Sequence, residues 1–134
     1  MVLEMVGVGS QYALASTDSK GRYLNGGKEY KLTIPADVPA KDFWSLVVYD
    51  PQTRSMLQTD QPYPSKNNER NKDLATNTDG STTLWFGPTP PKGHEANWIQ
   101  TVPGKGWFTC LRLYGPLQPW FDKTWRPGEI ELVD

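Results

Sequence analysis

The chain has 134 residues, which suits one domain with a single hydrophobic core. Its 14 basic and 15 acidic residues are scattered along the sequence and give a formal net charge of −1. Without a basic stripe, binding to nucleic acid or to an anionic membrane surface is not expected. The start of the chain has no basic, apolar leader and no long hydrophobic stretch follows, so we expect no signal peptide, no membrane insertion and, as the chain is written, a cytoplasmic location.

Short runs of β-branched and aromatic residues alternate with turns, and the twelve prolines and twelve glycines leave no room for a long helix. We therefore predict an all-β, antiparallel β-sandwich with one or two short helical turns. It forms a single domain over residues 1–134, with residues 1–9 as a flexible or helical lead-in. The expected strands, in chain order, are 11–16, 22–24, 29–34, 42–49, 81–87, 97–102, 106–115 and 128–134.

Turn residues and spacing predict some of the pairing between these strands. The turn at Asn25–Gly27 is typical of a tight hairpin, because Asn-Gly readily adopts positive φ. Strands 97–102 and 106–115 are joined by a short loop, so we expect them to pair antiparallel. Strand 42–49 is apolar on both sides and should be central. The long polar stretch after it is a candidate for a functional or mobile loop.

Arg112 interrupts the apolar strand 106–115. Strand alternation places it on the same side as Phe108, Cys110 and Tyr114, opposite the side of Trp107. A guanidinium among apolar neighbours needs partners, since an unpaired buried charge costs several kcal/mol, roughly. The nearest candidates in strand ends and loops are the carboxylates Asp50, Asp60, Asp122 and Glu129.

Three interpretations of Arg112 follow. It can be an internal clamp on the segment from Asp50 to Asp60, which is the favoured interpretation. It can instead line a concave sheet face and bind an anionic or hydroxyl-rich ligand through bidentate contacts. Third, it can simply reach solvent at a strand edge. The ligand-binding interpretation predicts a site made of Arg112, Tyr114, Asp50, Arg54, Asp60 and Tyr49.

Six tryptophans are many for a domain of this size. Trp44, Trp85 and Trp107 lie in strand patterns, so we expect them in the core. Trp120 and Trp125 lie among prolines near the end of the chain, where they can cap the core, form a protein interface or stack on sugar rings.

The residues for common catalytic sites are mostly missing. His94 is the lone histidine, so a multi-histidine metal centre and a serine triad are not expected. Cys110 is interpreted as a small buried hydrophobe. A carboxylate pair drawn from Asp50, Asp60 and Glu129 stays open as a hydrolase site. The sequence predicts no metal and no cofactor, and it favours a binding protein over an enzyme.

Three long strings carry a family resemblance: "YDPQTRSMLQTDQPYPS", "EANWIQTVPGKGWF" and "LRLYGPLQPWFDKTWRPGEIELV". They resemble the bacterial domain of unknown function 1214, from about "GVGSQY" to the carboxyl end. The resemblance implies a jelly-roll type of sandwich. It also implies longer, exported or periplasmic relatives in which the domain of unknown function 1254 precedes this one. This chain departs from that pattern, because it contains no preceding domain and no signal peptide.

Together these features predict an uncharacterised binding or assembly module that packs on a partner domain or self-associates. A jelly roll that binds a small ligand or a carbohydrate is the alternative, and a carboxylate-based hydrolase is the third class.

Overall fold

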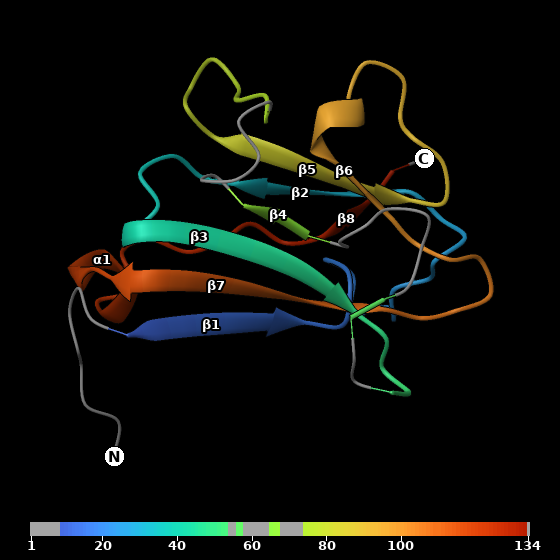
Figure 1. The fold of residues 1–134 in the computed structure, drawn as a ribbon, viewed down its shortest axis with the longest axis horizontal. Coiled ribbons are helices and arrows are strands. Elements are labelled where there is room, and N and C mark those ends of the chain that lie inside the picture. Colours follow the sequence, from blue (N-terminus) through green and yellow to red (C-terminus); the bar gives the residue numbers. More distant parts are fainter. Residues whose placement is uncertain (1–8, 54–55, 58–64, 68–73, 134) are drawn as a thin grey trace.

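The computed structural model describes residues 9–53, 56–57, 65–67 and 74–133, which form a mostly β structure with two sheets (Figure 1). The first sheet has the strand order β1 (Ser10–Ala15), β7 (Phe108–Pro116), β3 (Ala40–Tyr49) and β4 (Ser65–Asn67). The second sheet has the order β6 (Trp98–Gln100), β5 (Thr82–Gly87), β2 (Tyr30–Ile34) and β8 (Glu131–Leu132). Two short helical segments are present in the described ranges, η1 (Glu95–Asn97) and α1 (Gln118–Phe121). The predicted sandwich of mainly antiparallel strands is confirmed.

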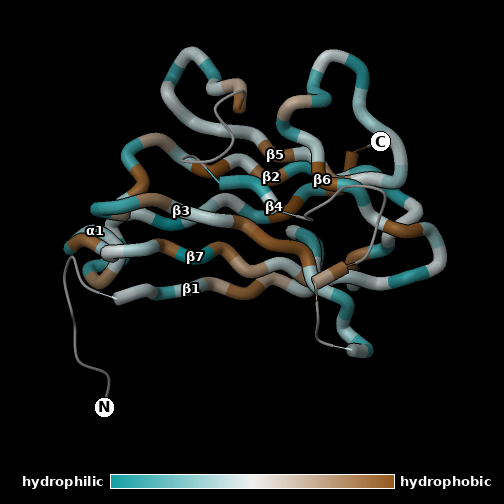
Figure 2. Tube along the Cα trace, in the orientation of Figure 1, coloured by the Kyte–Doolittle hydropathy of each residue, from teal (hydrophilic) through white to brown (hydrophobic). Residues whose placement is uncertain are grey.

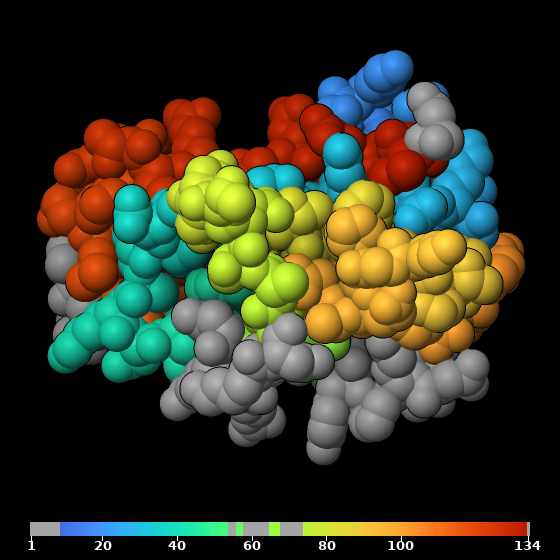
Figure 3. All heavy atoms as spheres, turned by 90° about the horizontal axis from the view of Figure 1, so that it is seen from above, coloured from blue at the N-terminus to red at the C-terminus, as the bar shows by residue number. Residues whose placement is uncertain are grey.

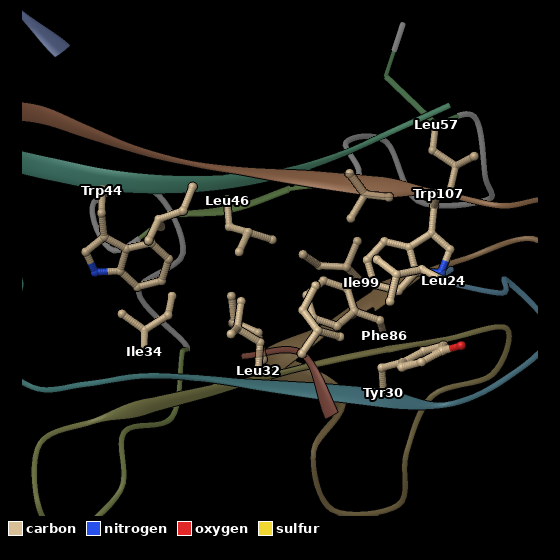
Figure 4. Packing of buried hydrophobic residues seen from close by; sticks show 14 of the residues in the cluster. Leu24, Tyr30, Leu32, Ile34, Trp44, Leu46, Leu57, Phe86, Ile99 and Trp107 are labelled. Atoms are coloured by element: carbon tan, nitrogen blue, oxygen red, sulfur yellow. The ribbon is translucent and has the colours of Figure 1, made fainter. Parts of the chain in front are cut away.

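Alternating side chains place the core between the two sheets. On β2, Tyr30, Leu32 and Ile34 are buried while the residues between them are partly exposed. Trp44 and Leu46 on β3 point toward β2 from the other sheet (Figure 4). This period of two buries one side of each strand in a shared layer. Brown, apolar stretches accordingly recur along β3 and β7, while the connecting loops are mostly pale or teal (Figure 2).

Aromatic rings fill one end of this core. Trp107 stacks on Phe86 with ring centroids 4.8 Å apart, and it meets Tyr30 edge-on at 5.6 Å (Figure 4). The Tyr30 hydroxyl accepts a hydrogen bond from the Asn25 backbone N–H at 3.0 Å. The large rings thus supply apolar area, and the single hydroxyl keeps a partner.

The predicted hairpin between strands 97–102 and 106–115 is wrong. β6 pairs parallel with β5 in the second sheet, whereas β7 pairs with β1 and β3 in the first. The loop between them therefore carries the chain from one sheet to the other. The expected strand 22–24 is reduced to an isolated bridge between Thr17 and Tyr23.

Gly26 explains why the loop does not close a hairpin. Its N–H donates to the Lys105 carbonyl at 2.8 Å, and its own carbonyl accepts from the buried Thr101 hydroxyl at 2.8 Å. A Cβ on Gly26 would lie 2.0 Å from the Val102 carbonyl oxygen. Positive φ is found at other positions, so the glycine is needed for this close approach and not for its turn conformation.

Candidate functional site

The side of the first sheet that faces away from the core is the candidate site. Arg112 lies at its centre, paired in register with Tyr12 on β1 and with Ser45 on β3. The predicted alternation of β7 is confirmed, because Leu111 and Leu113 point into the core. We define the outer face by the residues that share the side of Arg112 on the three long strands: Ser10, Tyr12, Leu14, Phe43, Ser45, Val47, Tyr49, Phe108, Cys110, Arg112 and Tyr114.

Aromatic stacks border Arg112 toward both ends of the outer face. Phe43 stacks on Tyr114 with centroids 4.4 Å apart, and Tyr49 stacks on Phe108 at 5.2 Å. Both stacks join β3 to β7 as cross-strand pairs. On β1, the side chains are open to solvent: Tyr12 is 58% exposed and Leu14 is 63% exposed. The outer face is therefore a mostly apolar surface whose β1 side is bare.

Arg112 is the only charged member of the outer face. Its guanidinium carbon lies 5.9 Å from the centre of the Tyr12 ring. A hydrogen bond to the Tyr114 side chain raises the pKa of Arg112 above its ordinary value, so the group stays cationic. Its Nε atom is buried and has no hydrogen-bond partner in the described part of the chain. Two tyrosines thus lie close to the guanidinium, and its Nε donor has no partner among the described residues.

The favoured sequence interpretation places Arg112 as a clamp on the segment from Asp50 to Asp60; residues 54–55 and 58–64 of that segment lie outside the described residues, and Asp50 itself has other partners. The Asp50 carboxylate accepts from the Gln52 backbone N–H at 2.9 Å and from Lys105 Nζ at 3.4 Å. These contacts hold the pKa of Asp50 below its usual range, with the Gln52 hydrogen bond as the main cause. Within the described ranges, the other ion pair joins Arg22 to Asp18. Lys105, which lies in the loop between β6 and β7, thus pairs with one of the carboxylates considered for Arg112.

The remaining predicted site residues divide into two groups. Tyr49, Tyr114 and Arg112 lie together on the outer face. Arg54 and Asp60 lie outside the described residues. Sequence reasoning did not single out Tyr12; its place in the expected strand 11–16 is the one signal that could have found it, because side chains alternate along a strand.

The opposite outer surface, on the second sheet, is built differently. Trp85 was expected in the core, yet it points outward from β5 and stacks on His94 with centroids 4.5 Å apart. The segments 74–80 and 88–97 lie over this side of the sheet (Figure 3). Trp85 and His94 border two small cavities there, of about 200 and 430 Å³.

Asn97 links the covering segments to the second sheet through hydrogen bonds. The side chain is 5% exposed, and its amide group donates to the carbonyls of Ala75 and Thr83, both at 2.8 Å. Its side-chain oxygen accepts from the Ala75 backbone N–H at 2.8 Å. Sequence reasoning missed Asn97, because nothing in the local string shows that a distant loop returns to this position.

The late tryptophans lie at the end of the sandwich near α1. Trp125 is in the core cluster and its indole N–H donates to the Ala36 carbonyl at 3.0 Å, as expected of a cap. Trp120 packs against the core from the side, and both border a cleft of about 320 Å³.

Features of common catalytic or membrane sites are not found in the described ranges. No three His, Cys, Asp or Glu side chains are grouped there to hold a metal ion. Cys110 is buried, and burial raises the pKa of its thiol, which disfavours the reactive thiolate. Across the same ranges, no helix is long and apolar enough to span a membrane.

The structure is thus a β-sandwich in which loops cover one outer surface and the other outer surface is bare along β1. The chain belongs to the family described as "Protein of unknown function (DUF1214)", whose model matches residues 9–118. Comparison with curated proteins gives no match.

Solved structures show the same fold within longer chains. The VPA0106 protein from Vibrio parahaemolyticus has 24% sequence identity and a TM-score of 0.79, and the match covers 95% of this chain and 31% of that one. An uncharacterised protein from Burkholderia cenocepacia has 19% identity and a TM-score of 0.54, with 96% and 36% covered. The chain therefore spans about a third of the length of these proteins, and the likeness shows the fold alone.

Proposed function

We propose that the chain is an assembly module whose outer face docks on another protein domain. The observation that carries this proposal is the bare β1 side of the outer face, where Tyr12 and Leu14 are mostly exposed beside Arg112. Tyrosine and arginine are the residues that most often anchor protein interfaces, because they join a large apolar area to a polar tip.

The outer face is made of eleven residues, so we propose that it forms the centre of an interface and not the whole of it. Stable interfaces bury about 800 Å² on each partner and involve roughly 20–30 residues a side. The outer face would supply the apolar middle, with exposed residues of the adjoining loops as the polar rim. Because the matched structures are about three times as long, a domain joined to this one is the partner that fits best.

We also propose that the strands follow a jelly-roll path and that residues 1–134 form a single domain. The family resemblance supports both. It also supports an exported or periplasmic compartment for the longer relatives, and the compartment of this chain stays a prediction.

A photo-crosslinking amino acid placed at two tyrosine positions tests the proposal. Tyr12 lies on the outer face, whereas Tyr23 is 84% exposed and lies off it, so it is the matched control. Each variant is produced in cells that naturally make the protein and is irradiated there. We expect one defined protein adduct from position 12 and none from position 23. Equal adducts from both positions, or none from either, would refute docking through the outer face.

A second candidate function is binding of a hydroxyl-rich small molecule at the covered surface. It is favoured by the cavity of about 200 Å³, which Trp85, His94, Lys31 and Asn77 line with aromatic and polar groups. Thermal-shift measurements against mono- and oligosaccharides test it. A rise of several degrees that is lost in Trp85→Ala supports this candidate. No rise with any sugar removes it.

A further inference from the structure

We propose that the docking partner presents a carboxylate, from an Asp or Glu side chain within an apolar surface, and that Arg112 binds it. This inference rests on the proposed function and names the chemistry of the partner. It starts from the charge on the outer face, where Arg112 stands alone among aromatic and aliphatic side chains.

Covering the outer face would remove the guanidinium from water. A buried cation without a counter-charge is strongly unfavourable, whereas a bidentate carboxylate restores both the charge balance and the hydrogen bonds. The chain itself supplies no such group from the described residues. Asp50 is held by Lys105, and Asp18 is held by Arg22. In the proposal, the counter-charge comes with the partner, because no described residue forms an ion pair with Arg112.

The position of the unused donor supports a carboxylate as the acceptor. Among the described residues, Nε of Arg112 has no hydrogen-bond partner, and the Tyr114 side chain lies close to the guanidinium. Arginine commonly binds a carboxylate through two parallel N–H groups. Tyr12, with more than half of its surface exposed, lies beside the guanidinium at 5.9 Å, so the proposal requires this ring to turn before a carboxylate reaches the buried Nε.

The lone charge of Arg112 also disfavours a second copy of this chain as the molecule that covers the outer face. In a two-fold contact, each outer face meets an identical outer face. Such a contact buries two guanidinium groups and brings no carboxylate from the outer-face residues, because none of them is acidic. Arg112 thus selects an acidic partner and opposes self-association through this surface.

Nuclear magnetic resonance on the isolated chain tests this chemistry without an identified partner. The probes are N-acetyl-phenylalanine, which carries a carboxylate, and its uncharged amide. The readout is the side-chain Nε–H signal of Arg112. Arg22 is the matched control, because its Nε already donates to Asp18 Oδ2 at 3.1 Å. We expect the acid to shift the Arg112 signal in a saturable way, at least tenfold more strongly than the amide, with Arg22 unchanged.

Other results separate this inference from the proposed function. Equal shifts by acid and amide would overturn the carboxylate preference. Equal shifts at Arg22 would show unspecific pairing, and no shift by either probe would also overturn the inference.

The crosslink from position 12 then gives the second measurement. We expect Arg112→Gln to reduce it at least tenfold. An undiminished crosslink would refute the role of Arg112 while leaving docking intact, whereas a missing crosslink in the wild type would refute the docking itself.

Discussion

The two outer surfaces of the sandwich differ in how their polar groups are satisfied. On the second sheet, segments 74–80 and 88–97 cover the surface, and Asn97 pairs each of its polar atoms with the backbone. On the first sheet, Tyr12 and Leu14 are bare and Arg112 keeps an unpaired Nε. Since buried polar groups in folded proteins are almost always paired, the covered surface serves the stability of the chain itself. Under the proposed function, a partner domain completes the outer face.

The largest effect is expected from Asn97 on the covered surface. Replacing Asn97 by Ala removes three part-buried hydrogen bonds to the backbone of Ala75 and Thr83, so the free energy of unfolding should fall by about 3 kcal/mol. Urea unfolding measures this change. Asn77→Ala is the matched control, because Asn77 makes its hydrogen bonds at an exposed position and should cost less than about 1 kcal/mol. Equal losses of stability in the two variants would show that the Asn97 side chain contributes no more than the exposed Asn77 side chain.

Removal of the charge from the outer face should change the association state. Arg112→Leu leaves a continuous apolar surface, and self-association no longer buries two cations. Sedimentation velocity should show a monomeric wild type and a concentration-dependent dimer of the variant. Arg22→Leu, a change outside the outer face, should stay monomeric. A wild type that dimerises as strongly as Arg112→Leu would show that the arginine does not oppose self-association.

Acid should weaken the covered surface and leave the outer face unaffected. Hydrogen bonds from the Ser81 hydroxyl and backbone N–H lower the pKa of Asp79, next to the covering loop. A lowered folded-state pKa means that this contribution to stability is present above the unfolded pKa, near 4, and is lost as the pH falls below it. The outer face has no carboxylate to titrate.

Melting temperatures at pH 7 and pH 3 measure how much stability the protein loses in acid. We expect Asp79→Asn to lose less stability between the two pH values than the wild type does. An identical loss in the variant would show that Asp79 does not contribute to the acid sensitivity.

The smallest effects on stability are expected at the bare β1 side. Tyr12→Ser and Leu14→Ser remove exposed side chains, so each should change the free energy of unfolding by no more than about 0.5 kcal/mol. Leu113→Ala, on the core side of the neighbouring strand, should cost about 3 kcal/mol because it leaves a cavity. Urea unfolding compares the three variants. A loss above about 1 kcal/mol for either serine variant would mean that the β1 side belongs to the core of the isolated chain.

The sequence predicted features that depend on local alternation. The period of two on strand 106–115 correctly put Leu111 and Arg112 on opposite sides of the strand, and the aromatic and β-branched runs located most strands. Which strands pair was harder to predict. The short loop before β7 was taken for a hairpin, but contacts between Gly26 and Lys105 turn it into a crossing between sheets.

The contacts of the site residues were equally hard to predict, because segments far away in the sequence make them. Lys105 reaches Asp50 because the crossing loop brings it there, so one of the four carboxylates considered for Arg112 is already paired. Trp85 reads as a core residue in its strand, and only the return of His94 over that strand gives it an outward stacking partner. Neither contact can be predicted from local spacing, because each joins segments whose relation is set by the whole sandwich.

The central claim is that Arg112 is placed for a partner and not for the stability of the isolated chain. Urea unfolding of Arg112→Leu against the wild type, at a protein concentration where both are monomeric, tests it most directly. We predict a free energy of unfolding within about 1 kcal/mol of the wild type, since leucine removes the unpaired Nε and keeps the apolar contacts. A loss of more than about 2 kcal/mol would contradict the account and make the arginine a structural element of the sheet.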